Sequence, residues 1–192
     1  MAKDLDTGLL IHKETVEWTT LSGSGSRRSV ERQGRFQFDI PEGEGAAETP
    51  QAEAWGQQIR SECGHLRGDV SLALPSDELL LRVISLPTTD PEELQGMVEL
   101  QLDKISPFPT ENMVVSYELL QERDGSALVM IAAARTQIVD DAAALLRPAG
   151  IDPVRVDAAV LGWWRLVVDS GRLDPEGRHV LGVIELSDVV KH

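Results

Sequence analysis

The chain consists of short blocks of apolar residues, and most blocks end at a turn that contains glycine, proline or aspartate. Blocks in which β-branched and aromatic residues dominate predict β-strands. Arg123-Asp124-Gly125 separates two such blocks and indicates a hairpin. In one block the polar and apolar alternation is interrupted by Gly34. The predicted strands are residues 8–11, 15–21, 30–38, 70–74, 78–86, 113–121, 127–134, 154–156 and 179–186.

Helical spacing of apolar residues marks the remaining blocks. The clearest begins at Asp90, an expected N-cap, followed by Pro91 at the first helical position and by Glu93, which is expected to complete a capping box. A Pro-Phe-Pro sequence ends this helix. Thr136 is the expected cap of a later one. The predicted helices are residues 50–63, 91–105, 136–149 and 158–170.

The order of these elements predicts a mixed α/β fold. An antiparallel start is followed by a helix, a strand, a β-α-β-β unit and then alternating helices and strands, an order that does not fit a helical bundle or a β-sandwich. Residues 41–50, rich in glycine and glutamate, indicate an exposed loop. The last predicted strand lies near the end of the chain, which leaves open whether the sequence is a whole protein or a piece of a longer one.

Composition narrows the classes of partner. The 192 residues carry a net charge of −14, which argues against binding to nucleic acid or to anionic membrane surfaces. No apolar run reaches the roughly 20 residues of a membrane-spanning helix, and the first residues lack the apolar region of a signal peptide. The single cysteine, Cys63, is typical of a reducing compartment. These features predict a soluble, cytoplasmic protein that is not inserted in the membrane.

Candidate catalytic groups are few. The carboxylate pairs Asp140 with Asp141 and Asp152 with Asp157 could support acid–base chemistry, but chance pairs are expected among 32 acidic residues. The spacing of the four histidines, relative to each other and to Cys63, matches no metal site. Cys63 and nearby His65 do not resemble a nucleophile and its base. We therefore assign no catalytic, cofactor-binding or metal-binding residue.

Several features could form either core or a partner-binding surface. The apolar stripe of the helix over 91–105 is expected to be core. Phe108 in the Pro-Phe-Pro turn is either displayed to a partner or holds the helix end. Trp163 and Trp164 point about 100° apart on a helix, so we expect one in the core and the other at an interface. An arginine cluster could dock an acidic tail or form a solvated face. Its members are Arg27, Arg28, Arg32 and Arg35.

An ordered set of short sequences carries a resemblance to a known family. The set comprises Val70-Ser-Leu-Ala-Leu-Pro75, residues 82–87, the acidic helix ending in Ile105-Ser-Pro-Phe-Pro109, Tyr117-Glu-Leu-Leu120, Val129-Met-Ile-Ala-Ala-Ala-Arg135 and residues 149–158. It resembles the PilM family of type IV pilus assembly proteins, and is similar to the cytoplasmic domain of the GspL proteins of type II secretion. The likeness covers about residues 68–168, and more weakly 6–40.

The resemblance implies an actin-like (ribonuclease H-like) half with an inserted β-α-β-β subdomain. Residues 1–78 and 136–192 would form part of the actin-like subdomain, and residues 79–135 the insertion, which in the family flanks a groove used for partner contacts. It also implies a bacterial, cytoplasmic scaffold that reaches the inner membrane through partners. The implied partner is either the short cytoplasmic tail of an inner-membrane assembly-platform protein or the secretion ATPase. The partner-binding residues stay unassigned, and self-association stays open.

The family's phosphate loop, usually Gly-Leu-Asp-Ile-Gly-Ser-x-Ser-Ile-Lys, aligns with residues 8–17. Leu10 then replaces the aspartate, and His12 replaces a glycine that lets backbone amides approach phosphate. A shifted match uses Asp6-Thr7-Gly8 instead. Only the beginning of a second half, residues 180–186, is present, so we expect a scaffold without catalysis. The alternatives are an actin-like ATP-binding protein whose second half is absent from this chain, and a small α/β enzyme of unrelated type.

Overall fold

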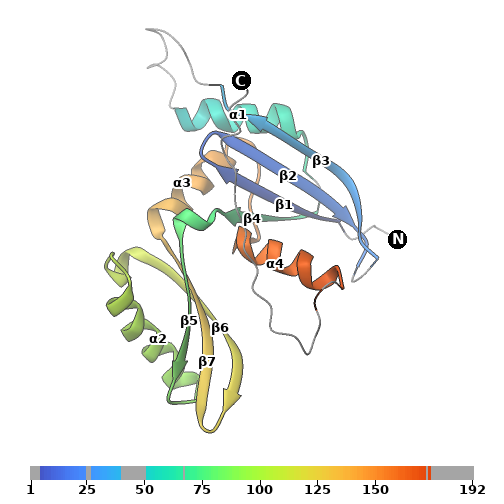
Figure 1. Cartoon of the computed structure of the whole chain (residues 1–192). Helices are drawn as coiled ribbons and strands as arrows, with labels where there is room; N and C mark the ends of the chain where they lie inside the picture. The colour runs from blue at the N-terminus through green and yellow to red at the C-terminus, as the bar shows by residue number, and fades with distance from the viewer. Residues whose placement is uncertain (1–4, 25–26, 40–50, 67, 172, 174–192) are drawn as a thin grey trace, which may run out of the picture.

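The strands divide between two sheets in the computed structural model (Figure 1). The structure describes residues 5–24, 27–39, 51–66, 68–171 and 173. The five-stranded main sheet has the order β3-β2-β1-β4-β8, and a three-stranded second sheet has the order β5-β7-β6. The main-sheet strands are β1 (Leu5–His12), β2 (Thr15–Ser22), β3 (Ser29–Gln37), β4 (Asp69–Leu74) and β8 (Arg155–Ala158).

Antiparallel and parallel pairing meet at β1 in the main sheet. β1 pairs antiparallel with β2 and parallel with β4, and β4 continues parallel to β8. Parallel pairs need a crossover connection, and helices supply it here. The helices around this sheet are α1 (Gln51–Cys63), α3 (Thr136–Leu146) and α4 (Ala159–Asp169).

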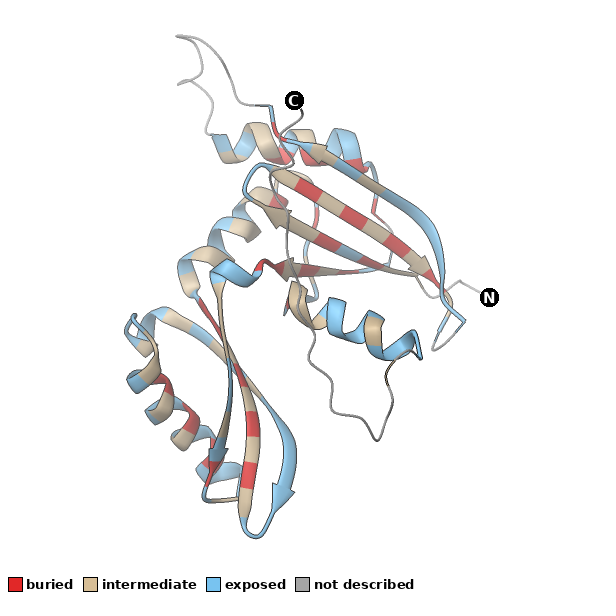
Figure 2. Cartoon of the chain, viewed as in Figure 1, coloured by how far each residue is buried: buried red, intermediate tan, exposed pale blue. Residues whose placement is uncertain are grey.

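The main core lies between one face of the main sheet and the helices α1 and α3. In β2 every second residue is buried, which gives the alternating red and tan bands of Figure 2. Ile59 and Cys63 of α1 and Leu146 of α3 pack against this face. The two-residue period of the strands thus selects which side chains enter the core. The buried strand residues in this core include Leu9, Val16, Trp18, Val70, Leu72 and Leu74.

The second sheet and one helix form the insertion between β4 and α3. Helix α2 covers one face of this antiparallel sheet (Figure 1) and buries Leu94 and Val98 against Ala127, Val129 and Ile131. Its elements are β5 (Leu79–Leu86), α2 (Pro91–Ile105), β6 (Met113–Arg123) and β7 (Ser126–Arg135), with 3-10 turns η1 (Ser76–Glu78) and η2 (Thr110–Asn112).

Every predicted strand and helix within the described residues is present, with shifts of a few residues at the ends. Thr136 is not a cap, because it is already the first residue of α3 and Arg135 holds the cap position without a side-chain bond. The predicted strand 179–186 and the whole of the predicted loop 41–50 lie outside the described residues.

The start of α2 differs in detail from the predicted capping box. Asp90 is the N-cap, and its carboxylate accepts a hydrogen bond from the Glu92 amide at 2.9 Å. Glu93 instead accepts a bond from the Thr88 hydroxyl at 2.7 Å, and that hydroxyl accepts the Asp90 amide at 3.1 Å. Thr88 therefore links the two residues that a reciprocal box would join directly.

Gly34 interrupts the alternation of β3 because of its neighbour across the ladder. Gly34 is paired with Trp18, and a Cβ at position 34 would lie 2.8 Å from the indole Nε1. The indole thus covers the glycine, and Arg32 stacks over the same ring at 4.9 Å. Trp18 stays buried because residue 34 has no side chain.

Gly34→Ala should lower the free energy of unfolding by about 1–3 kcal/mol, since the new methyl group forces the packed indole to move. Gly96→Ala is the matched control: it lies in α2 with open space around its Cβ, and should raise stability by about 0.5–1 kcal/mol. Urea denaturation of both variants checks the opposite signs. A neutral Gly34→Ala would contradict this account of β3.

Candidate functional site

The inserted sheet has one face without a covering helix among the described residues. Along β7, residues 127, 129, 131 and 133 are buried, and the first three pack with α2. Side chains alternate along a strand, so Leu128, Met130 and Ala132 point to the opposite face, where they are only half-buried. The centre of this sheet is therefore apolar on both sides although α2 covers only one.

Neighbouring strands extend this apolar surface. The register places Val83 of β5 beside Met130, and Leu81 beside Ala132. Residues directly opposite in an antiparallel pair share a face. Val83 is 55% exposed and Val114 of β6 is 48% exposed, which is high for valines in a sheet. We call this surface the open face, and its members are Leu81, Val83, Val114, Leu128, Met130 and Ala132.

Polar residues border the open face. Glu118 of β6 lies opposite Met130, Ser116 opposite Ala132, and Ser85 of β5 opposite Leu128. A register shift between Leu119 and Gln121 marks an irregularity at the far end of β6. An apolar strip with a polar margin is the composition of a protein-binding patch, in which apolar burial supplies affinity and polar edges fix register.

At its other end the open face passes into the main core. Leu79 and Ala134 are paired in the ladder, and both pack with the main core. Arg135 ends β7, and α3 begins at Thr136 without a linker. The insertion is therefore attached through a shared core and two short connections, which gives the open face a rigid support.

A charged cluster lies at this junction. His12 Nε2 is 3.4 Å from the Asp77 carboxylate in η1. Burial raises the pKa of the neighbouring Glu78, the Asp77 carboxylate raises it further, and His12 and Arg135 partly oppose the rise. The Arg135 guanidinium also stacks 5.1 Å above the ring of Phe108. Phe108 is exposed and contacts Arg135 at the junction, and its display to a partner stays a prediction.

This junction includes the turn where the family's phosphate loop would lie, and its residues do not fit a nucleotide phosphate. Leu10 offers no metal ligand, and His12 is engaged by Asp77. Two carboxylates, Asp77 and Glu78, lie close to the histidine and would repel a phosphate group. We therefore derive no nucleotide chemistry at this site.

The shifted phosphate-loop match does not fit either. Asp6, Thr7 and Gly8 lie inside β1, well before its turn. Thr7 is buried and hydrogen-bonded to Thr20 at 2.8 Å, and Asp6 pairs with Arg28 at 3.0 Å. These residues therefore belong to the sheet and do not form a phosphate-binding loop.

One carboxylate of each predicted pair is hydrogen-bonded to a residue close to it in the sequence. Asp141 accepts a hydrogen bond from Gln137 at 2.7 Å, and Asp157 accepts one from the Ala158 amide at 2.8 Å. All four carboxylates are exposed. Among the described residues, no group of three histidine, cysteine or acidic side chains could hold a metal ion. The structure brings no candidate catalytic residues together in that part of the chain.

The arginine cluster is largely engaged within the molecule. Arg28 pairs with Asp6 and Arg35 pairs with Glu17 at 3.3 Å. Arg32 stacks on Trp18 and donates to the Cys63 carbonyl at 3.2 Å. The cluster thus braces the edge of the main sheet, which weakens the interpretation as a docking site for an acidic tail.

The tryptophan prediction is wrong in one respect. Trp163 is 48% and Trp164 is 44% exposed, so neither lies in the described core. The stripe of α2, by contrast, is core as predicted, with Leu94, Val98 and Leu102 buried. Sequence reasoning missed the open face, although apolar residues at both even and odd positions of 127–134 were a signal for it.

Comparison with known proteins identifies the family. Residues 42–171 match the family model described as type IV pilus assembly protein PilM. The chain belongs to the PilM family. No curated protein matches the sequence. In the part of the chain that the structure describes, no helix combines the length and apolarity needed to cross a membrane.

Two solved structures share the fold of this chain. The structure described as the PilM-PilN type IV pilus biogenesis complex aligns with a TM-score of 0.67 and 25% identity, covering 84% of this chain and 49% of that chain. The second structure is the cytoplasmic domain of EpsL, an inner-membrane component of the type II secretion system of Vibrio cholerae. It aligns with a TM-score of 0.53 and 20% identity, covering 83% of this chain and 58% of that chain. The chain thus spans about half the length of the PilM structure that it matches. The mixed α/β fold expected from the sequence is confirmed, and the PilM-PilN structure shares it.

The free energy of unfolding should depend on pH through the buried thiol of Cys63. Burial raises the pKa of its thiol from 9.0 to about 11, with Glu62 adding to the rise and Arg32 opposing it. Between these values the folded thiol keeps its proton while the unfolded thiol loses it, so stability falls as pH rises through this window. Wild type should lose up to about 2 kcal/mol more than Cys63→Ala between pH 8 and pH 10.5. Urea unfolding at both pH values measures this, and equal losses would contradict it.

Proposed function

We propose that this chain is a cytoplasmic scaffold of a type IV pilus or type II secretion assembly platform, and that it acts without catalysis of its own. Membership of the PilM family and the likeness to the PilM-PilN complex support this role. Its partner is the cytoplasmic segment of an inner-membrane assembly protein, and the secretion ATPase is the alternative partner.

The observation that carries the proposal is the open face. It places Val83, Met130 and Leu128 on a sheet that is backed by α2 and joined to the main core. A rigid apolar surface binds an extended or helical segment at a low cost in entropy. This part of the chain has the properties of a docking platform, whereas the phosphate-loop residues do not favour nucleotide.

Charge supports a segment from a membrane protein. Cytoplasmic segments next to membrane spans are enriched in lysine and arginine. This chain carries a net charge of −14. Glu118 and Glu122 lie on β6, the edge strand of the inserted sheet. We therefore propose an apolar segment with flanking basic residues, whose approach is accelerated by opposite charge and slowed by salt.

Binding to synthetic peptides tests the docking site. The peptides cover the cytoplasmic segments of the pilus and secretion inner-membrane proteins from the same organism. One of them should bind the wild-type chain, and Val83→Asp with Met130→Glu should weaken its Kd by about 100-fold or more, because two charges enter the apolar contact. Leu100→Asp, on the outer surface of α2 and 61% exposed, is the matched control and should bind normally. If the double variant binds the peptide as tightly as Leu100→Asp does, the open face is not the docking site. If none of the peptides binds the wild-type chain, the secretion ATPase is favoured as the partner.

Nucleotide titration tests the absence of an ATP site. Because the Asp77 carboxylate contacts His12 and Leu10 replaces the aspartate of the family's loop, Mg-ATP at about 1 mM, the upper end of typical KM values, should leave the Tm unchanged. A ligand present at 100 times its Kd would add about 2.7 kcal/mol and raise the Tm by several degrees. A magnesium-dependent rise would overturn the scaffold-only interpretation. The same ATP series with Asp77→Ala shows whether its carboxylate is what excludes the nucleotide.

A further inference from the structure

The outer edge of β6 lacks the features that usually protect an edge strand. β6 ends the inserted sheet, and among the described residues β7 is its only neighbour in the ladder (Figure 1). From Met113 to Leu119 the pairing with β7 is regular, and the register shift comes only after Leu119. This stretch has no proline and no lysine, and Glu118 is its one charge. Because unpaired backbone groups on an edge attract another strand, such an edge is open to pairing.

The hairpin turn decides which backbone groups of β6 point outward. Asp124 and Gly125 have φ values of 51° and 75°, which is typical of a two-residue type I′ turn, and the residues that flank such a turn form a hydrogen-bonded pair. Bonded and non-bonded positions then alternate along an antiparallel ladder. Counted along β7, which carries no extra residue, the alternation turns the amides and carbonyls of Val115, Tyr117 and Leu119 away from β7.

The side chains of β6 show where those of an added strand would lie. Val115 and Tyr117 pack with the core under α2, whereas Ser116 and Glu118 lie on the side of the open face. Ser116 is paired with Ala132, and both side chains are short. A large apolar side chain beside Ser116 can therefore lean over them onto the open face.

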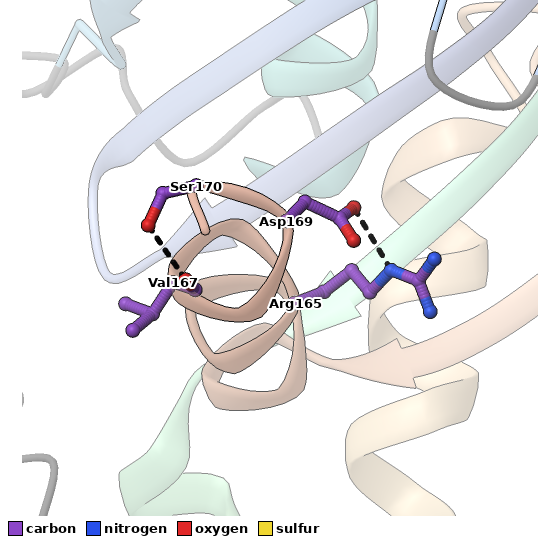
Figure 3. A network of polar contacts seen from close by, with 4 residues as sticks. All are labelled: Arg165, Val167, Asp169 and Ser170. Atoms are coloured by element: carbon purple, nitrogen blue, oxygen red, sulfur yellow. Dashed lines mark hydrogen bonds and ion pairs between the residues drawn. The ribbon is translucent and has the colours of Figure 1, made fainter. Parts of the chain in front are cut away.

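Helix α4 also exposes apolar side chains, but it cannot accept a strand. A helix bonds its own backbone groups along its length. The polar side chains of α4 and its cap also bond locally: Arg165 Nε donates to the Asp169 carboxylate at 2.9 Å, and the Ser170 hydroxyl donates to the Val167 carbonyl at 2.6 Å (Figure 3). The edge of β6 differs because it combines exposed apolar residues with backbone groups that point outward.

Given the proposed function, on which this assignment rests, we propose that the inner-membrane segment binds as a β-strand added to the outer edge of β6, with a lysine or arginine opposite Glu118. Glu118 is exposed and forms no ion pair with another described residue. The position opposite it is a close, non-hydrogen-bonded one, where opposite charge is favourable. A second copy of this chain fits less well, since residues 113–119 contain no basic residue and each copy carries −14.

N-methylation of the peptide backbone tests strand addition, because the methyl group removes one amide donor and leaves the side chain in place. The probe is the inner-membrane peptide that binds the wild-type chain, methylated at one position at a time. Every second amide of an added strand faces β6. Methylation at alternate positions should therefore weaken the Kd by about ten-fold or more, and methylation between them by less than about three-fold.

The other results of this series separate the binding mode from the partner. Similar losses at successive positions would indicate a helical segment, and no loss at any position would indicate docking through side chains alone. Either result overturns strand addition and leaves the proposed function intact. If no inner-membrane peptide binds the wild-type chain, strand addition falls together with that choice of partner.

Hydrogen exchange of the wild-type chain locates the added strand. A saturating amount of the unmodified peptide should slow exchange of the Val115, Tyr117 and Leu119 amides by at least about ten-fold. Protection of the Leu81 and Val83 amides instead would place the strand on β5, the other end strand of the sheet, and would overturn the assignment to β6.

Val115→Pro removes one outward amide from β6 itself. Proline is accepted on an edge strand where the amide faces solvent, so the fold should be retained while the Kd weakens by about ten-fold. Val115→Thr keeps the amide and the branched shape, and as the matched control it should bind within about two-fold of wild type. Equal affinity of the two variants would overturn the proposal. If Val115→Pro does not fold, the N-methyl series decides, since it uses the wild-type chain.

Discussion

The structure depends on one strand, β7, that belongs to two hydrophobic cores. Val129 and Ile131 face α2 in the inserted sheet, and Ala134 packs with the main core. The strand then continues into α3 without a linker. Because both cores are close-packed, the insertion cannot rotate without opening one of them. Small residues at 132–134 let the two layers approach closely where they meet.

This constraint decides which surfaces are left for function. One side of β7 is filled by α2, and the other side joins the main core only near Ala134. Beyond that point Leu128 and Met130 have neighbours in the sheet but, among the described residues, no layer above them. The open face is thus a consequence of the topology: a three-stranded sheet with a single helix must leave one face to solvent or to a partner. Its apolar composition favours the partner.

Much of the fold could be predicted from the sequence because local signals and tertiary packing agree. Pro91 and Asp90 mark the start of α2, and the helix begins there. Two features could not be predicted, because they depend on residues that are distant in the sequence. The role of Gly34 depends on Trp18, which is far away in sequence but paired across β2 and β3. The exposure of both tryptophans could not be foreseen, because helical spacing shows that a face is apolar and not which element covers it.

The candidate site was less predictable than the fold for a related reason. A nucleotide site has local sequence signals, and Leu10 and His12 can be assessed from the residue types alone. A docking surface has no such motif, since it is defined by which side of a strand lacks a neighbour. The same residues, 127–134, would be an ordinary buried strand if a second helix covered them. The family supplies the class of protein, whereas the register of β5, β6 and β7 decides which side chains are available. The surface proposed for docking is therefore the uncovered side of the inserted sheet, which β7 joins to the main core.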